Sequence, residues 1–159
     1  VLENVLLGSE LAGTRDKEKA KNLLMKAGLE EYDKAYPHEL SGGMKQRAAF
    51  IRSILSPQDL MCLDEPFSAL DELTRLQMQQ WLLSVWEENR RSVLFVTHSI
   101  DEAVFLSDRI YVLSAKPAAV IKEVKVPFSR PRREEQLLSD EFIHLKRELY
   151  AALKPTFTT

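Results

Sequence analysis

The sequence has few of the features that mark several other classes of protein. A single cysteine, Cys62, excludes an internal disulfide, and its place in an apolar run predicts a buried thiol. The formal net charge of −2 gives no broad electrostatic case for nucleic-acid binding. We find neither a signal peptide nor an apolar stretch long enough to span a bilayer, so we expect a cytosolic protein.

A lysine-bearing phosphate loop, with the pattern GxxxxGK followed by Ser or Thr, is also missing from these residues. Gly8 and Gly13 have the spacing of such a loop. The pattern requires lysine at position 14 and Ser or Thr at position 15, but the chain has Thr14 and Arg15 there. A helix-like segment precedes them instead of a buried strand, so the required context fails. The chain opens at Val1 in mid-pattern, which indicates a fragment or a trimmed chain.

The residues that are present predict one globular domain of the α/β class. The chain has 159 residues, 45% hydrophobic and 29% charged, which is enough for a core. Helices are expected at 1–12, 16–27, 41–55, 72–89, 100–106 and 139–153, and strands at 60–63, 92–97, 110–113 and 119–126. The first two strands are continuous apolar runs, typical of strands buried on both faces, and the last alternates like an edge strand. Strands alternating with helices predict a mostly parallel, doubly wound sheet.

In such a sheet, ligands bind beyond the carboxyl ends of the strands. Asp64 and Glu65 follow the first buried strand, and Thr97 and His98 follow the second. We therefore expect these side chains on one rim of the sheet.

A glycine turn opens the helix that begins after Ser41. The N–H groups at a helix start are unpaired and carry a partial positive charge, and Gly42 and Gly43 leave room for a phosphate beside them. The hydroxyl of Ser41 adds a donor. A plain serine cap with a tight glycine turn is the alternative interpretation.

The acidic pair Asp64-Glu65 can hold a metal and activate water. Two carboxylates at the end of a buried strand are costly unless a cation or a water network holds them. One acid can orient Mg²⁺, and the other can take a proton from an attacking water. An acidic turn that faces solvent at Pro66 is the alternative.

His98 and Asp71 are further candidates. A neutral imidazole at position 98 could contact a terminal phosphate oxygen or the attacking water, although a lone histidine is more often structural. His38 and His144 lack such a setting and are expected at the surface. Asp71 fits the cap of the helix that starts at Glu72, a role compatible with a second one.

With these residues in order, the chain closely resembles the nucleotide-binding subunit of ATP-binding cassette (ABC) transporters. Residues 40–47 (LSGGMKQR) match the family signature, residues 60–66 (LMCLDEP) the Walker B strand with the catalytic glutamate, residues 68–71 (SALD) the D-loop, and residues 96–98 (VTH) the switch histidine. The proline- and arginine-rich stretch 127–133 resembles the nitrate, sulfonate, taurine and bicarbonate importer branch.

The resemblance implies a partial P-loop NTPase (RecA-like) core. It assigns residues 1–47 to the helical subdomain, 48–126 to the partial ATPase core, and 127–159 to a linker and a C-terminal helix. Asp64 would help to hold Mg²⁺, Glu65 would polarise the hydrolytic water, and His98 would sense the γ-phosphate of ATP. Contacts to nucleotide across a head-to-tail dimer would come from Ser41, Gly42, Gly43, Gln46 and Asp71. The partners would be a second such subunit, a transmembrane permease and indirectly a solute-binding protein, at the cytoplasmic face of the membrane.

The missing phosphate loop is a departure from the family. Its strand would lie between strands 93–97 and 110–113, so we expect a gap there. The isolated chain is expected neither to bind ATP tightly nor to hydrolyse it, and to be loosened, swapped or poorly soluble.

Two alternatives stay open. The first is a DNA-repair or translation ATPase, which shares the signature. Such proteins carry long coiled-coil or tandem inserts, and no insert interrupts residues 47–64 here. A truncated, non-catalytic interaction module of the same family is the other. We expect Arg130, Arg132 and Arg133 to lie in a solvated linker. Contacts of these arginines with lipid headgroups, a partner or the parent protein's own surface are the alternatives.

Overall fold

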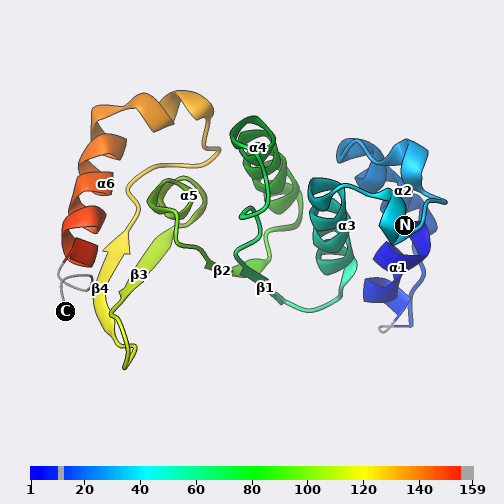
Figure 1. The fold of residues 1–159 in the computed structure, drawn as a ribbon, viewed down its shortest axis with the longest axis horizontal. Coiled ribbons are helices and arrows are strands. Elements are labelled where there is room, and N and C mark those ends of the chain that lie inside the picture. The colour runs from blue at the N-terminus through cyan, green and yellow to red at the C-terminus, as the bar shows by residue number, and fades with distance from the viewer. Residues whose placement is uncertain (11–12, 155–159) are drawn as a thin grey trace. The chain divides into compact units, whose positions relative to one another are not determined.

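A computed structural model of the chain describes residues 1–10 and 13–154, which divide into two compact units, residues 1–94 and residues 95–159 (Figure 1). The first unit holds α1 (Leu2–Glu10), α2 (Lys17–Lys26), η1 (Glu30–Tyr32), η2 (Pro37–Glu39), α3 (Gly42–Leu55), β1 (Leu60–Asp64) and α4 (Glu72–Asn89). Strand β2 (Ser92–Val96) runs from the first unit into the second. The second unit continues with α5 (Ile100–Leu106), β3 (Arg109–Leu113), β4 (Val120–Lys125), η3 (Glu134–Leu138) and α6 (Asp140–Leu153). The order of helices and strands expected from the sequence is confirmed, although residues 11 and 12 of the first expected helix lie outside the described residues.

Local chemistry explains where the helices begin and end. Short polar side chains accept a hydrogen bond from the backbone N–H three residues further on, and so satisfy a donor that the helix cannot. The residues that do so are Asp16, Ser41, Asp71, Ser99 and Ser139. Gly28 follows α2 with φ +64°, the left-handed exit that the sequence predicted.

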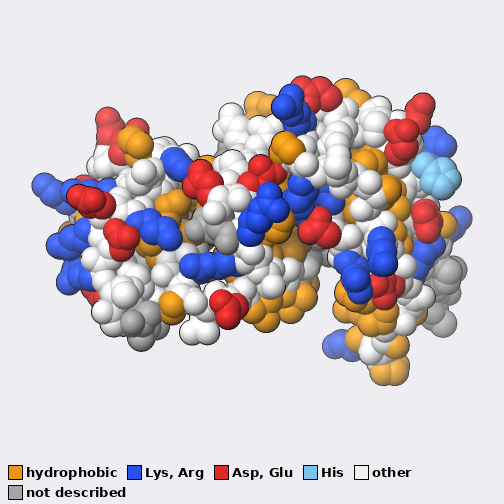
Figure 2. Space-filling view, turned by 180° about the vertical axis from the view of Figure 1, so that it is seen from behind, with side chains coloured by type: hydrophobic (Ala, Val, Ile, Leu, Met, Phe, Trp, Pro, Cys, Tyr) orange, Lys and Arg blue, Asp and Glu red, His pale blue; other side chains and the backbone are white. Residues whose placement is uncertain are grey.

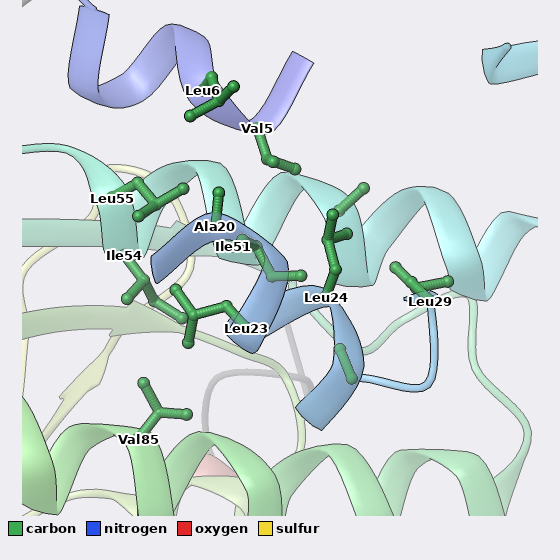
Figure 3. Packing of buried hydrophobic residues seen from close by; sticks show 12 residues of the cluster. Val5, Leu6, Ala20, Leu23, Leu24, Leu29, Ile51, Ile54, Leu55 and Val85 are labelled. Atoms are coloured by element: carbon green, nitrogen blue, oxygen red, sulfur yellow. The ribbon is translucent and has the colours of Figure 1, made fainter. Parts of the chain in front are cut away.

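The core of the first unit is built by one apolar face from each helix (Figure 3). One buried cluster contains Val5 and Leu6 of α1, Leu23 and Leu24 of α2 and Ile51 of α3, and all of them are at most 5% exposed. Val85 of α4 belongs to the same cluster. The helical periodicity of these residues in the sequence predicted the buried faces correctly.

Gly8 lies inside α1, where α1 passes close to α3. A Cβ atom at this position would overlap the carbonyl oxygen of Arg52, so only glycine permits the approach. Gly8 is therefore a packing residue, which agrees with the rejection of residues 8–15 as a phosphate loop.

Strands β1 and β2 form a two-stranded sheet, joined through α4, the kind of connection that a parallel pair needs. The expectation that both strands are buried on both faces is wrong: Leu60 is 53% exposed and Leu94 is 55% exposed. The predicted burial of Cys62 is wrong for the same reason, and its thiol is exposed. A strand is covered on both faces only when other elements pack on both, and the described chain does not supply them here.

Strands β3 and β4 form a separate antiparallel pair, with Ile110 opposite Val124. The expected single sheet is thus present as two pairs, and β2 and β3 are not neighbours in either. The gap expected from the missing strand stays a prediction. Strand β4 is half-exposed as predicted, since Val124 is buried and Ile121 is exposed.

Helix α6 covers α5 and β3 in the second unit (Figure 1). Phe142 and Leu149 of α6 are buried, and the ring of Phe142 stacks on Phe128 at 5.9 Å between centroids. An ion pair of 2.8 Å between Lys122 and Glu148 adds a link between β4 and α6. Among the described residues, no helix combines the length and apolar character required to cross a membrane.

The interpretation of the three arginines as a solvated linker is wrong for two of them. The side chain of Arg132 is 1% exposed, and its Nη1 donates to the carbonyl oxygens of Phe105 (3.0 Å) and Ser107 (2.6 Å) at the end of α5. Arg130 Nε donates to a carboxylate oxygen of Asp108 at 2.8 Å. Only Arg133 is exposed. The last carbonyls of a helix lack intrahelical donors, and the guanidinium groups supply them.

Candidate functional site

The signature turn lies at the N-terminus of α3, on open surface. Ser41 and Gly42 are exposed, and a Cβ atom at Gly42 would meet no atom within 4 Å. The Oγ atom of Ser41 accepts the N–H of Met44 at 3.2 Å, which leaves its own proton free to be donated. Helix geometry leaves the N–H groups of Gly42 and Gly43 without an intrahelical acceptor. The turn can therefore present several donors to one anion.

Gly43 brings the signature turn against the segment that follows the acidic pair. A Cβ atom at Gly43 would lie 2.8 Å from Cδ2 of Leu70, a side chain that is 6% exposed. A larger residue at position 43 would push the two segments apart. The sequence predicted both motifs, and the structure places them in contact within one unit.

Asp64 ends β1 with an exposed carboxylate, and Glu65 follows with its side chain half-buried. The sequence interpretation requires that the glycine turn and the acidic pair be open to the surface. Neither of them is enclosed among packed side chains. Glu65 has φ +46°, a left-handed conformation that glutamate rarely adopts. The surrounding turn must hold this strained backbone in place.

Two anchors hold the turn after Glu65. The backbone N–H and the hydroxyl of Ser68 both donate to the carbonyl oxygen of Glu65, at 3.2 and 3.0 Å. Phe67 is fully buried, and its ring stacks on Phe50 of α3 with centroids 5.5 Å apart. The acidic pair is thus fixed to α3, the helix that carries the signature turn.

Asp71 caps α4, and its carboxylate accepts the N–H of Thr74 at 3.0 Å. Hydrogen bonding to Thr74 lowers the pKa of Asp71 from its ordinary value of 3.8. The contribution of the charged cap to stability is therefore complete above that value and is lost as the pH falls through the lowered pKa. The capping role is confirmed, and the role at the nucleotide stays a prediction.

Replacing Asp71 with asparagine is expected to separate the two roles. Asparagine caps a helix about as well as aspartate, so stability at pH 7 should be unchanged. If Asp71 also contacts a nucleotide, as the resemblance implies, loss of this charge-assisted contact should lower ATP hydrolysis about tenfold in a subunit that also contains a phosphate loop. Urea unfolding and steady-state hydrolysis measure the two effects, and Asp71→Ala, which removes both, is the comparison. An Asp71→Asn subunit as active as the unchanged one would leave Asp71 with the cap alone.

His98 follows β2 at the start of the second unit, and its side chain is exposed. Glu65 belongs to the first unit, so the approach of the two side chains on one rim stays a prediction. His38 and His144 are exposed, as expected.

Gln46 lies one turn into α3, and its Oε1 atom is buried without a hydrogen-bond partner among the described residues. A hydroxyl or amide donor brought by another molecule would satisfy this acceptor. Its assignment to nucleotide contact stays a prediction.

Asp64 does not form a self-sufficient metal site. No group of three or more His, Cys, Asp or Glu side chains that could hold a metal occurs in residues 1–10 and 13–154. Mg²⁺ usually keeps several waters and takes one or two carboxylates together with substrate phosphates. A single exposed carboxylate fits that manner of binding.

A groove of about 680 Å³ lies between β4 and α6, and none of the predicted site residues lines it.

Figure 2 shows Lys and Arg side chains interspersed with Asp and Glu over one face of the molecule. A surface of mixed charge does not favour a nucleic-acid partner on this face.

The sequence predicts Thr97 on the rim of the sheet, but it assigns neither Thr97 nor Glu102 a task in the site. Glu102 is a buried acid, 6% exposed, and Thr97 Oγ1 donates to its Oε2 atom at 2.6 Å. The pattern Ser99-x-x-Glu102 is a capping-box signature, and this signal could have drawn attention to Glu102.

Comparison with known proteins gives the same family as the sequence motifs. Residues 1–68 match the ABC transporter family. The chain is 42% identical over 157 residues to an uncharacterized ABC transporter ATP-binding protein of Methanocaldococcus jannaschii, covering 97% of the chain and 58% of the relative. It is 40% identical over 164 residues to the taurine import ATP-binding protein TauB of Rhizobium johnstonii, covering 98% of the chain and 63% of that protein. Its fold matches a dimeric ATP-binding cassette solved in a post-hydrolysis state with ADP and Pi (TM-score 0.60, 32% identity, 71% of this chain and 48% of that one).

The fold is that of part of an ATP-binding cassette, in the P-loop NTPase class. The chain belongs to the ABC transporter ATP-binding family. It spans about 60% of the length of these relatives, since it covers 58% of the first and 63% of the second.

Proposed function

We propose that this chain is the signature-bearing portion of the ATP-binding subunit of an ABC importer, in which ATP hydrolysis drives uptake of a nitrate-, sulfonate- or taurine-like solute. The observation that carries the proposal is the packing of the signature turn, through Gly43, against Leu70 in the segment that follows the acidic pair. Both turns open on the surface, as a site completed by another subunit requires. The likeness to the taurine importer protein supports the solute class.

Each side chain has a task in the proposed reaction. Glu65 orients the hydrolytic water and takes its proton, and His98 contacts the terminal phosphate. The N–H groups of the signature turn and the Ser41 hydroxyl stabilise negative charge on the phosphates. Gln46 and Asp71, like the signature turn, contact the nucleotide held by the opposite subunit of the dimer.

The cofactors that fit are ATP and Mg²⁺. Bound Mg²⁺ would neutralise charge on the phosphates, and Asp64 would hold it through one carboxylate. Asp64 is exposed at the end of β1, which leaves room for the water molecules that Mg²⁺ retains.

The division of labour along the chain follows the resemblance. Residues 1–47 act as the helical subdomain, residues 48–126 as part of the ATPase core, and residues 127–159 as a linker and C-terminal helix. The partners are a second nucleotide-binding subunit in a head-to-tail dimer, a transmembrane permease and, indirectly, a solute-binding protein. The subunit works peripherally at the cytoplasmic face of the membrane.

The isolated 159-residue chain is expected to bind Mg-ATP more weakly than about 1 mM and not to hydrolyse it. The reason is that these residues contain no phosphate loop, whose backbone and lysine hold the β- and γ-phosphates. Isothermal titration and phosphate release measure both properties. The comparison is the complete subunit, meaning the polypeptide in which a phosphate loop precedes this segment, which should bind and hydrolyse ATP.

Two outcomes would contradict the proposal. Tight Mg-ATP binding by the isolated chain would show that the segment carries a whole site of its own. A complete subunit that binds its permease but never hydrolyses ATP would favour the non-catalytic interaction module instead.

A further inference from the structure

The turn that carries His98 is closed by a side-chain relay. Thr97 Oγ1 donates to Glu102 Oε2 at 2.6 Å and accepts the backbone N–H of Ser99 at 3.0 Å. His98 lies between Thr97, which carries this hydroxyl, and Ser99, whose N–H the hydroxyl accepts. The relay thus fixes the chain on both sides of an exposed imidazole.

The relay departs from an ordinary capping box. In that motif the Glu side chain at the third helical position accepts the N–H of the capping residue directly. Here the hydroxyl of Thr97 stands between Glu102 and the N–H of Ser99. The departure ties residue 97, which precedes the histidine, to helix α5.

Helix capping alone does not account for the relay. Ser99 already caps α5, since its Oγ accepts the N–H of Glu102 at 3.4 Å. Glu102 as a whole is 6% exposed, and burying an acidic group is costly unless it has partners. An isolated cap would not need a buried acid, whereas a rigid turn at His98 would use one.

We infer that Thr97 and Glu102 are positioning residues for His98, holding the turn so that the imidazole is presented in one fixed direction toward the terminal phosphate. The inference rests on the proposed ATPase function. Positioning of this kind lowers the barrier because the imidazole does not have to be ordered during the reaction.

The first experiment measures the turn itself, without ATP. Thr97→Val removes the hydroxyl at nearly constant volume, and Thr97→Ser keeps it. In the 159-residue chain, or in the complete subunit if the chain gives a poorly dispersed spectrum, amide exchange of Ser99 should accelerate about tenfold in Thr97→Val. The His98 ring resonances should shift or broaden, and Thr97→Ser should restore both properties.

Thr14→Val is the matched control. The hydroxyl of Thr14 donates to the carbonyl oxygen of Ser9 at 3.2 Å, so the same substitution removes one hydroxyl–backbone bond in the first unit. It should leave the Ser99 amide and the His98 resonances unchanged. Unchanged Ser99 exchange and His98 resonances in Thr97→Val would overturn the inference.

The second experiment measures hydrolysis by the complete subunit. Thr97→Val should lower kcat about tenfold and leave the KM for ATP within twofold, since the lost effect is on the transition state. Thr97→Ser should recover most of kcat. An unchanged kcat, or a rise in KM alone, would overturn the positioning role.

The two experiments distinguish failure of the positioning inference from failure of the proposed ATPase function. If Thr97→Val does not fold, Glu102→Gln, which keeps an acceptor oxygen without the charge, should show a smaller effect in the same direction, and its absence would count against the inference. If the unchanged complete subunit hydrolyses no ATP while the spectra respond as expected, the proposed function is wrong and the relay is a structural lock only.

Discussion

A Glu65→Gln variant of the complete subunit is expected to lose hydrolysis by about 10²–10⁴-fold while it retains ATP binding. The amide has almost the same size but cannot take a proton from water, and general-base catalysis contributes a factor of this order. Single-turnover phosphate release measures the loss, and equilibrium binding of ATP under the same conditions shows that the site still assembles.

Backbone strain must be separated from chemistry at this position. Glu65 has φ +46°, and glutamine has the same backbone preferences as glutamate, so Glu65→Gln leaves the strain unchanged. Glu72→Gln, an exposed acid in the first turn of α4, is the control for a nearby loss of charge. A Glu65→Gln subunit with hydrolysis within about threefold of the unchanged one would assign the base to another group.

An Arg132→Met variant is expected to lose about 3 kcal/mol of stability, because several carbonyl oxygens at the end of α5 would lose their donor. Nη1 of Arg132 donates to Phe105 and Ser107, and Nη2 donates to Asp108. Burial and, next, the neighbouring cation of Arg130 lower the pKa of Arg132 to about 10, against the opposing effect of Asp108. The guanidinium therefore stays charged at neutral pH, and methionine replaces only its apolar stem.

Arg133→Met is the matched control, since Arg133 is exposed in the same segment. Surface substitutions usually change stability by no more than about 0.5 kcal/mol. Urea unfolding gives the free energies, and amide exchange in α5 and α6, compared with that in α3 of the first unit, shows whether the loss is confined to the second unit. Equal unfolding midpoints for the two variants would show that the buried contacts of Arg132 contribute nothing net.

The elements that the sequence predicted well are those decided by neighbours along the chain. Ser41 and Asp71 cap helices because their side chains reach the N–H groups three residues on, and Gly28 ends α2 because it tolerates a positive φ. The apolar face of α3, with Ile51 buried, follows from its period. The family motifs are also short stretches of neighbouring residues, so they too can be recognised from the sequence alone.

The predictions that failed depended on distant parts of the chain. Leu60 and Leu94 form apolar strands, yet they are exposed because a strand is buried only by elements that pack on both of its faces. Cys62 is exposed with them. Arg132 was expected in solvent, and it is buried because the end of α5 offers carbonyl oxygens.

The sequence by itself determined the helices and the strands, since residue type and spacing are sufficient for these, and it predicted the chemistry of residues 41–43 and 64–65. Only the tertiary structure decided that Gly43 rests on Leu70, that Thr97 closes the turn at His98 through Glu102, and which charged side chains are buried. The physical reason is that such contacts join residues whose approach depends on how whole elements pack, and no local pattern encodes that geometry.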